Sequence, residues 1–365
     1  MSAVFTPSRL RLARQRRGLT GRKLATAVEV PERNLSHYEN GTAIPPPDVV
    51  ERLAKELQVE PGFFAQDDVE DIPVEAISFR ALSKMSARKR DSAIAAGVLA
   101  VELDNWIAAR FKRPAPDIPT LDHPRRTPEA AAREVRARWG MGEAPAPNLV
   151  HLLEAHGVRV YSLATDCTDV DAFSTWWKGT PYVFLNMMKS RERGRFDAAH
   201  ELGHLVMHAV EGVPHGPEAE REAQQFASAF LMPAADVLAR GLRHATLDRV
   251  LHDKRRWRVA AMALTHRLNE LGLLSEWGYR SLCIELSKRG YRSGEPDADP
   301  SRETSQVLSK VFQSLWTQRV GVSDIAQELR LSPEELNRHV FGLLAGQPAE
   351  VSSAEAVRER PRLVR

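Results

Sequence analysis

The sequence predicts an α+β protein that is mostly helical, with an all-α N-terminal domain, a central domain built on a small sheet and a helical C-terminal region. Apolar residues recur at helical spacing over most of the chain, most clearly in residues 257–274. A His-Glu-x-x-His pattern at residues 200–204 also has the spacing of a helix. Three short apolar runs bounded by glycine or proline predict the strands of the sheet, and they span residues 158–163, 172–177 and 182–185.

The composition fits a globular protein of two or three domains, since the chain has 365 residues of which 43% are hydrophobic. No run approaches the roughly 18 apolar residues of a membrane span, and the N-terminus lacks the pattern of a secretory signal. Cys167 and Cys283 are too few for a disulfide framework, which fits a reducing compartment. We therefore expect a cytoplasmic protein without a membrane partner.

The N-terminal segment predicts a helix-turn-helix. Residues 8–17, 21–28 and 31–40 have helical patterns, and Gly18 with a Thr20 cap separates the first two. A short helix, a tight turn and a second helix of this length form that motif.

Seven basic side chains and no acid lie between Arg9 and Lys23. Such density favours contact with phosphate, although a solvated helix face carries the same pattern. Residues 19–41, which end in Tyr-Glu-Asn-Gly, resemble the XRE (lambda-repressor-like) DNA-binding family. The resemblance implies that the third helix lies in the major groove of an operator duplex. The side chains expected to contact DNA are Arg22, Lys23, Glu32, Arg33, Asn34 and His37.

Two residues depart from the pattern of that family. Gly21 stands where Gln is usual, which removes a phosphate contact. Glu29 stands in the turn where Gly is usual, and a positive φ there is costly for a residue with a Cβ. The affinity for DNA could therefore be modest, or the domain could have become a protein-binding module.

The pattern at residues 200–204 predicts a metal site. Residues four apart on a helix lie about 6 Å along the axis and on one face, so His200 and His204 can bind one ion at about 2.0–2.1 Å. Glu201 falls beside that site, where its carboxylate can act as general base. Asp197 is the expected N-cap of the helix. The alternative is an ordinary amphipathic helix with histidines that bind nothing.

A third ligand is expected from the next helix, which spans residues 218–230 after Pro217. Glu222 shares a face with apolar residues and is the predicted ligand, whereas Glu220 is placed on a polar face. His208 is expected behind the metal ligands or in the core.

Three stretches, Tyr182–Asn186, Arg195–His208 and Glu222–Pro233, resemble the ImmA/IrrE family of intracellular metallopeptidases over residues 149–290. The resemblance implies a zincin-like domain with one Zn2+ per chain, although another divalent metal could fill such a site. It also implies a protein substrate, because relatives cut a repressor. Gln224 replaces the usual Asn, a mild departure. The implied roles are zinc ligand for His200, His204 and Glu222 and general base for Glu201.

The two motifs together predict a DNA-binding regulatory zinc metalloendopeptidase that cleaves a repressor or another regulatory protein. Arg195, His208 and Tyr182 are the candidates to stabilise the transition state. The alternative is a non-proteolytic XRE-family regulator or a toxin–antitoxin component that uses the zincin fold for sensing or dimerisation.

The predicted organisation has five parts: a helix-turn-helix domain (1–66), a helical linker region (67–128), a metallopeptidase domain (129–292), a C-terminal helical hairpin (293–346) and a disordered tail (347–365). The C-terminal hairpin is expected to dock or dimerise, so a homodimer is one expectation.

Overall fold

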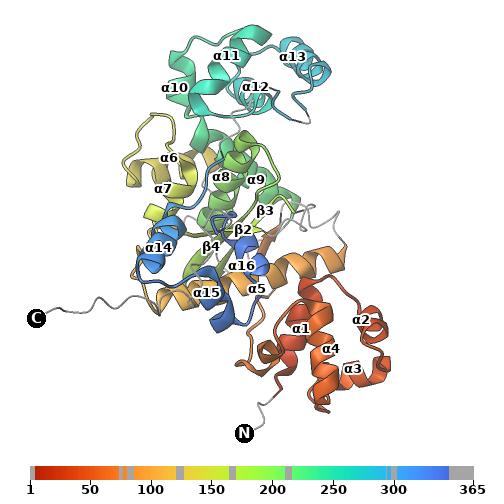
Figure 1. Ribbon diagram of the computed structural model, residues 1–365. Helices are drawn as coiled ribbons and strands as arrows, with labels where there is room; N and C mark the ends of the chain where they lie inside the picture. Colours follow the sequence, from red (N-terminus) through yellow and green to blue (C-terminus); the bar gives the residue numbers. More distant parts are fainter. Residues whose placement is uncertain are drawn as a thin grey trace, which may run out of the picture.

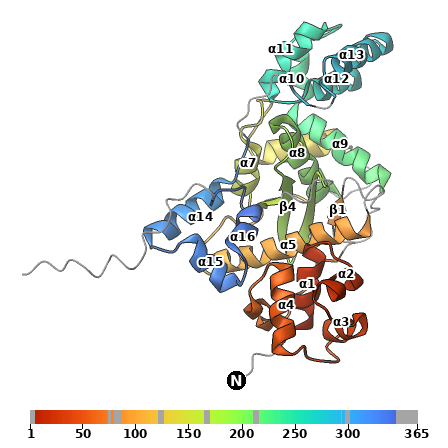
Figure 2. The ribbon, with the colours of Figure 1, turned by 45° about the vertical axis from the view of Figure 1, so that its right-hand side comes forward.

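The computed structural model confirms the α+β class, with helices packed around one four-stranded sheet (Figures 1 and 2). The predicted tail at 347–365 and Cys167 lie outside the residues that the structure describes. Within those residues, no helix is long and apolar enough to cross a bilayer. The described residues are 5–73, 77–79, 86–120, 127–163, 170–209, 216–292, 294–296 and 302–344.

The sheet has the strand order β1-β3-β4-β2. β3 and β4 form an antiparallel hairpin through Lys178 and Gly179, which both have a positive φ, as a tight two-residue turn requires. β2 runs parallel to β4, and β1 pairs antiparallel with β3. The three predicted strands are confirmed, and β1 is an additional strand. Their bounds are Ile77–Phe79 (β1), Arg159–Leu163 (β2), Ala172–Trp177 (β3) and Thr180–Asn186 (β4).

Both faces of the sheet are covered. The helix α5 (Ala87–Ala108) packs on the face that carries Tyr182 and Phe184, and α8 (Arg191–Met207) packs on the face that carries Val183. Figure 2 shows α5 crossing beneath the strands and α8 on their other side. The region predicted as a helical linker therefore supplies one strand and one whole layer of the fold.

The N-terminal domain has the predicted helix-turn-helix. Its turn is tight because Glu29 adopts a left-handed φ of 54°, the conformation expected from its position. Thr20 caps the second helix by accepting a hydrogen bond from the Lys23 amide at 3.2 Å. The helices are α1 (Pro7–Arg16), α2 (Gly21–Ala27), α3 (Glu32–Glu39), α4 (Pro47–Leu57) and the 3-10 helix η1 (Pro61–Ala65).

The basic stretch that begins at Arg9 is not a continuous phosphate-binding surface. Arg9 is buried and forms an ion pair with Glu102 of α5 at 2.6 Å. Arg14 pairs with Glu39 of α3. A buried guanidinium needs a carboxylate partner, so these groups stabilise the fold instead of facing DNA. The prediction that this stretch contacts phosphate is wrong for Arg9 and Arg14. It is also wrong for Arg16 and Arg17, which form ion pairs with an acid near the C-terminus.

That acid is Glu335, and it joins the N-terminal domain to the C-terminal helices. Arg16 Nε lies 2.6 Å and Arg17 Nη1 2.9 Å from its carboxylate oxygens. The C-terminal helices also pack on the sheet through β2, where Ser162 donates a hydrogen bond to the Arg338 carbonyl. The predicted hairpin thus docks onto its own chain. Its helices are α14 (Gln306–Thr317), α15 (Val322–Leu329) and α16 (Pro333–His339).

The remaining helices surround α8 or extend beyond it. In Figure 1, α10 to α13 form a lobe at the top of the molecule, away from the N-terminal domain. The bounds are α6 (Pro128–Arg138), α7 (Leu149–Ala155), α9 (Pro217–Leu231), α10 (Ala234–Ala239), α11 (Leu247–Trp257), α12 (Ala261–Glu270) and α13 (Glu276–Lys288).

Candidate metal centre and DNA-contacting helix

The helix α8 carries the His-Glu-x-x-His pattern and lies between the sheet and α9. It begins earlier than expected: Ser190 is the N-cap and accepts a hydrogen bond from the Arg193 amide. The prediction of Asp197 as N-cap is therefore wrong, and Asp197 is buried within the helix. The longer helix places His200 well inside a rigid element and His204 in its last turn, which fixes the direction of both side chains.

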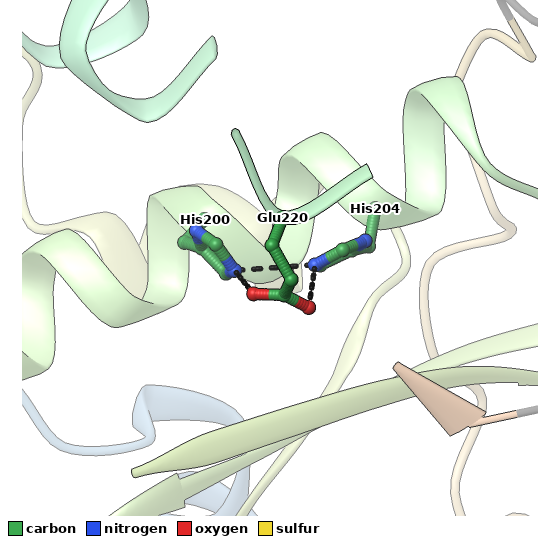
Figure 3. Close-up of side chains that lie close together, drawn as sticks. All are labelled: His200, His204 and Glu220. Carbon is green, nitrogen blue, oxygen red and sulfur yellow. Dashed lines mark hydrogen bonds and ion pairs between the residues drawn. The ribbon is translucent and has the colours of Figure 1, made fainter. Parts of the chain in front are cut away.

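His200 and His204 point toward each other and toward Glu220 of α9 (Figure 3). The two Nε2 atoms lie 3.1 Å apart. The Glu220 carboxylate lies 3.2 Å from His200 Nε2 and 3.3 Å from His204 Nε2. Two ligands of a tetrahedral zinc with bonds of about 2.0–2.1 Å lie roughly 3.3 Å apart, so the two Nε2 atoms are spaced for one ion. One ligand atom from each of the three residues lies within 4.8 Å of the other two, so Glu220 can complete the group.

The electrostatics of the three groups agree with that reading. Burial would raise the pKa of Glu220, but hydrogen bonds with His200 and His204 outweigh it and lower the pKa to about 2. Glu220 is therefore ionised at neutral pH. A carboxylate and two imidazoles form a donor set that divalent zinc accepts.

The structure places Glu222 elsewhere, so its prediction as third ligand is wrong. Its carboxylate contacts His208 Nε2 at 2.9 Å, and its side chain is 39% exposed. The side chain of Glu220, predicted to lie on a polar face, is 27% exposed and reaches the histidines. The buried stripe of α9 runs through Ala223 and Phe226, and the two acids flank that stripe on opposite sides, about 200° apart around the helix. The crossing of α8 and α9 decides which side meets the histidines.

Gly203 allows that crossing to be close. A Cβ at this position would lie 3.1 Å from Cδ1 of Phe226 and 3.2 Å from Cα of Ala223. Any side chain at residue 203 would push α9 away, and with it Glu220.

Glu201 is almost fully buried beside the histidines. Ser174 of β3 donates a hydrogen bond from Oγ to Oε2 of Glu201 at 2.7 Å. Ser174 is not among the predicted site residues, although a hydroxyl in the middle of a buried, apolar strand was a usable signal. Its side chain faces α8 because it shares the face of Trp176, whose indole donates to the Leu205 carbonyl.

Of the three predicted transition-state stabilisers, Tyr182 and Arg195 are directed away from this centre, and His208 contacts only the far side of the His204 ring. Tyr182 lies on the opposite face of the sheet, where its hydroxyl donates to Asp104 at 2.9 Å. Burial, together with the Asp104 carboxylate, raises the pKa of Tyr182. Arg195 is buried against Glu303 at 2.6 Å. Nδ1 of His208 lies 3.0 Å from Nδ1 of His204. This nitrogen of His204 is on the opposite side of the ring from Nε2, which faces His200 and Glu220. These assignments are wrong because each side chain is directed to another partner.

The residues predicted to contact DNA lie on α2 and α3. Figure 1 shows α3 at the outer edge of the N-terminal domain. His37 is half-buried, with Nδ1 2.7 Å from the Thr42 hydroxyl, and its Nε2 accepts from Arg33. The other five predicted side chains, namely Arg22, Lys23, Glu32, Arg33 and Asn34, are exposed.

Comparison with protein families agrees with both resemblances. Residues 153–269 match the family described as the IrrE N-terminal-like domain, a peptidase family, and residues 8–62 match a helix-turn-helix domain. No curated protein matches the chain. The first segment contains β2 to β4, α8 and α9, and the second contains α1 to α4. The chain is therefore a fusion of a helix-turn-helix DNA-binding domain with a domain similar to the ImmA/IrrE peptidases.

Proposed function

We propose that the chain is a DNA-binding regulatory metalloendopeptidase that hydrolyses a peptide bond in a protein substrate with one zinc ion. The observation that carries the proposal is the group of His200, His204 and Glu220 at ligand spacing beside the buried carboxylate of Glu201. By family resemblance, the substrate would be a transcriptional repressor, and its cleavage would change the expression of a gene set.

Each residue of the centre has a defined role in this proposal. His200, His204 and Glu220 would hold the ion. When bound, zinc polarises a carbonyl group and lowers the pKa of water. Glu201 would accept a proton from the attacking water at a carboxylate oxygen and pass it to the nitrogen of the leaving peptide. The hydrogen bond from Ser174 holds Oε2 of Glu201 and so fixes the direction of that carboxylate.

An extended substrate can bind to the edge of the sheet by main-chain hydrogen bonds. β3, which carries Ser174, is covered on its outer side by β1, and the register sets Ser78 opposite Ser174. We place substrate pairing at this edge, where an incoming peptide adds to β1 or replaces it.

The DNA-binding part of the proposal rests on α3. Its exposed polar side chains, with Arg22 and Lys23 of α2, can reach base edges and phosphates when α3 lies in a major groove. Because the arginines of α1 are paired within the protein, few phosphate contacts remain, and the affinity is expected to be modest.

The test compares purified wild-type protein with Glu201→Gln, Glu220→Ala and the control Glu218→Gln. Zinc content is measured by mass spectrometry, and cleavage is measured on a mixed peptide library. Glu201→Gln should keep zinc but lose cleavage, Glu220→Ala should lose both, and the exposed Glu218 should tolerate its change. Cleavage by Glu201→Gln at the wild-type rate would falsify the mechanism.

A gel shift addresses the non-proteolytic alternative. In the proposed function, chelation of the metal stops cleavage and leaves DNA binding unchanged, since the metal ligands come from α8 and α9 and none comes from α3. A regulator that uses zinc only for sensing would instead lose or gain DNA binding on chelation, with no peptide cleaved in either state.

A further inference from the structure

A chain of three side chains extends from the metal centre toward the surface. His204 Nε2 faces His200 and Glu220, and its Nδ1 lies 3.0 Å from Nδ1 of His208. The other nitrogen of His208, Nε2, lies 2.9 Å from Oε2 of Glu222. His204 and His208 are buried, and Glu222 is partly exposed, so the chain ends at a solvated carboxylate.

The hydrogen-bond roles along this chain are mutually consistent. A neutral imidazole that binds a metal through Nε2 carries its proton on Nδ1. His204 would therefore donate from Nδ1 to Nδ1 of His208. The proton of His208 is then on Nε2, from which it donates to the carboxylate of Glu222. With zinc bound, each ring would have one tautomer, and the last acceptor would be the carboxylate of Glu222.

The site is buried enough for these bonds to matter. His204 and His208 lie one helical turn apart at the C-terminal end of α8, and α9 closes over them at the contact between Gly203 and Phe226. In such a low-dielectric setting, an oriented hydrogen bond is stronger than in water. It both fixes the ring plane of the ligand and increases the electron density on its metal-binding nitrogen.

We propose that His208 and Glu222 are positioning residues for His204, and that they increase the affinity of the centre for zinc without touching the ion. The inference rests on the proposed metal site. It assigns to Glu222 and Glu220 two different functions: Glu220 is the ligand, and Glu222 anchors the chain that orients a ligand.

The experiment measures zinc affinity of the full-length protein by competition with a chromogenic chelator. The variants are His208→Gln, Glu222→Gln and Glu220→Gln, with Glu218→Gln as a control from the same helix. Removal of an outer-shell partner of a metal ligand typically weakens affinity about 10–100-fold. We expect a roughly 10–100-fold weaker zinc affinity for His208→Gln and Glu222→Gln, with one zinc still bound per chain. Glu220→Gln should lose one-to-one binding, and Glu218→Gln should bind zinc like the wild type.

Two further measurements separate positioning from general damage. The visible spectrum of the cobalt-substituted protein should shift in His208→Gln and Glu222→Gln, because the ring plane of His204 is released. The unfolding midpoint of the metal-free Glu222→Gln variant should stay at the wild-type value, because Glu222 is partly exposed and Gln can still accept the hydrogen bond from His208. A shifted cobalt spectrum with an unchanged midpoint supports the proposal, and an unchanged spectrum overturns it.

The remaining outcomes are also decisive. Wild-type zinc affinity in both Glu222→Gln and His208→Gln overturns the positioning role while leaving the proposed function intact. Loss of stoichiometric binding in Glu222→Gln with retention in Glu220→Gln also overturns it, since Glu222 would then be the ligand. Failure of the wild-type protein to bind zinc removes the proposed function itself, and the two failures are thus distinguishable.

Discussion

Two glycines of α8 should respond in opposite directions to the same substitution. At Gly203 an added Cβ meets the Phe226 ring at 3.1 Å and the backbone of α9 at Ala223 at 3.2 Å, so α9 has to move. Overpacking of this kind costs about 1–3 kcal/mol, partly offset by the roughly 1 kcal/mol that alanine gains over glycine in a helix. At Gly194 nothing lies within 4 Å of the added Cβ, so only the helix gain remains.

Urea denaturation of the metal-free protein, followed by tryptophan fluorescence, measures both variants. Gly194→Ala should raise the free energy of unfolding by about 0.5–1 kcal/mol. Gly203→Ala should lower it by about 1 kcal/mol. It should also weaken zinc binding, because α9 carries Glu220. Equal stabilisation by the two substitutions would refute the close crossing of α8 and α9.

Three other predictions follow from the contacts described above. Glu335→Gln should cost about 3–5 kcal/mol at pH 7, since it removes the buried carboxylate that pairs with Arg16 and Arg17. The exposed Glu334→Gln should be neutral in the same urea titration. Burial would raise the pKa of Glu335, but the surrounding histidine and arginines hold this pKa well below 4.5. The ionised carboxylate therefore stabilises the folded protein above pH 4.5, and this stabilisation is lost as the pH falls through the lowered pKa. The free energies of unfolding of the wild type and of Glu335→Gln should thus converge in acid. Ser174→Ala should lower kcat roughly 10–100-fold with little change in KM, because a hydrogen bond to a charged group contributes about 1.5–3 kcal/mol. Ser174→Thr keeps a hydroxyl and should keep most of the rate. Equal kcat values for the two variants would contradict the role of Ser174 in holding Glu201. Lys23→Ala should reduce the slope of log affinity for duplex DNA against log salt concentration by about 1. Lys55→Ala, on the exposed side of α4, should leave this slope unchanged. Identical slopes for Lys23→Ala and the wild type would exclude a phosphate contact at Lys23.

The parts of this molecule that the sequence predicts well are set by neighbours in the chain. His200 and His204 meet because residues four apart share a helix face. The helix-turn-helix could be outlined because the Thr20 cap and the Glu29 turn act within a few residues. The strands β2 to β4 were visible because each is buried on both faces and reads as an apolar run.

The errors arise where a distant partner decides. Glu220 and Glu222 are equivalent with respect to the buried stripe of their helix, and only the packing of α9 on α8 distinguishes them. The three residues of β1 are too few for a period, and they form a strand because β3 offers an open edge. Arg16 has the appearance of a DNA contact until Glu335, which lies 319 residues later in the chain, folds against it.

The connection between the two functional domains follows from the same long-range contacts. Leu10 of α1, Leu99 of α5, Phe184 of β4 and Leu336 of α16 belong to one buried cluster, so the DNA-binding domain and one face of the sheet share a core. The opposite face of that sheet carries Ser174 and, through it, Glu201. A flexible linker would let the helix-turn-helix move independently of the peptidase-like domain, whereas a shared core holds the two together. The orientation of α3 is thereby fixed relative to the sheet that supports the candidate metal centre.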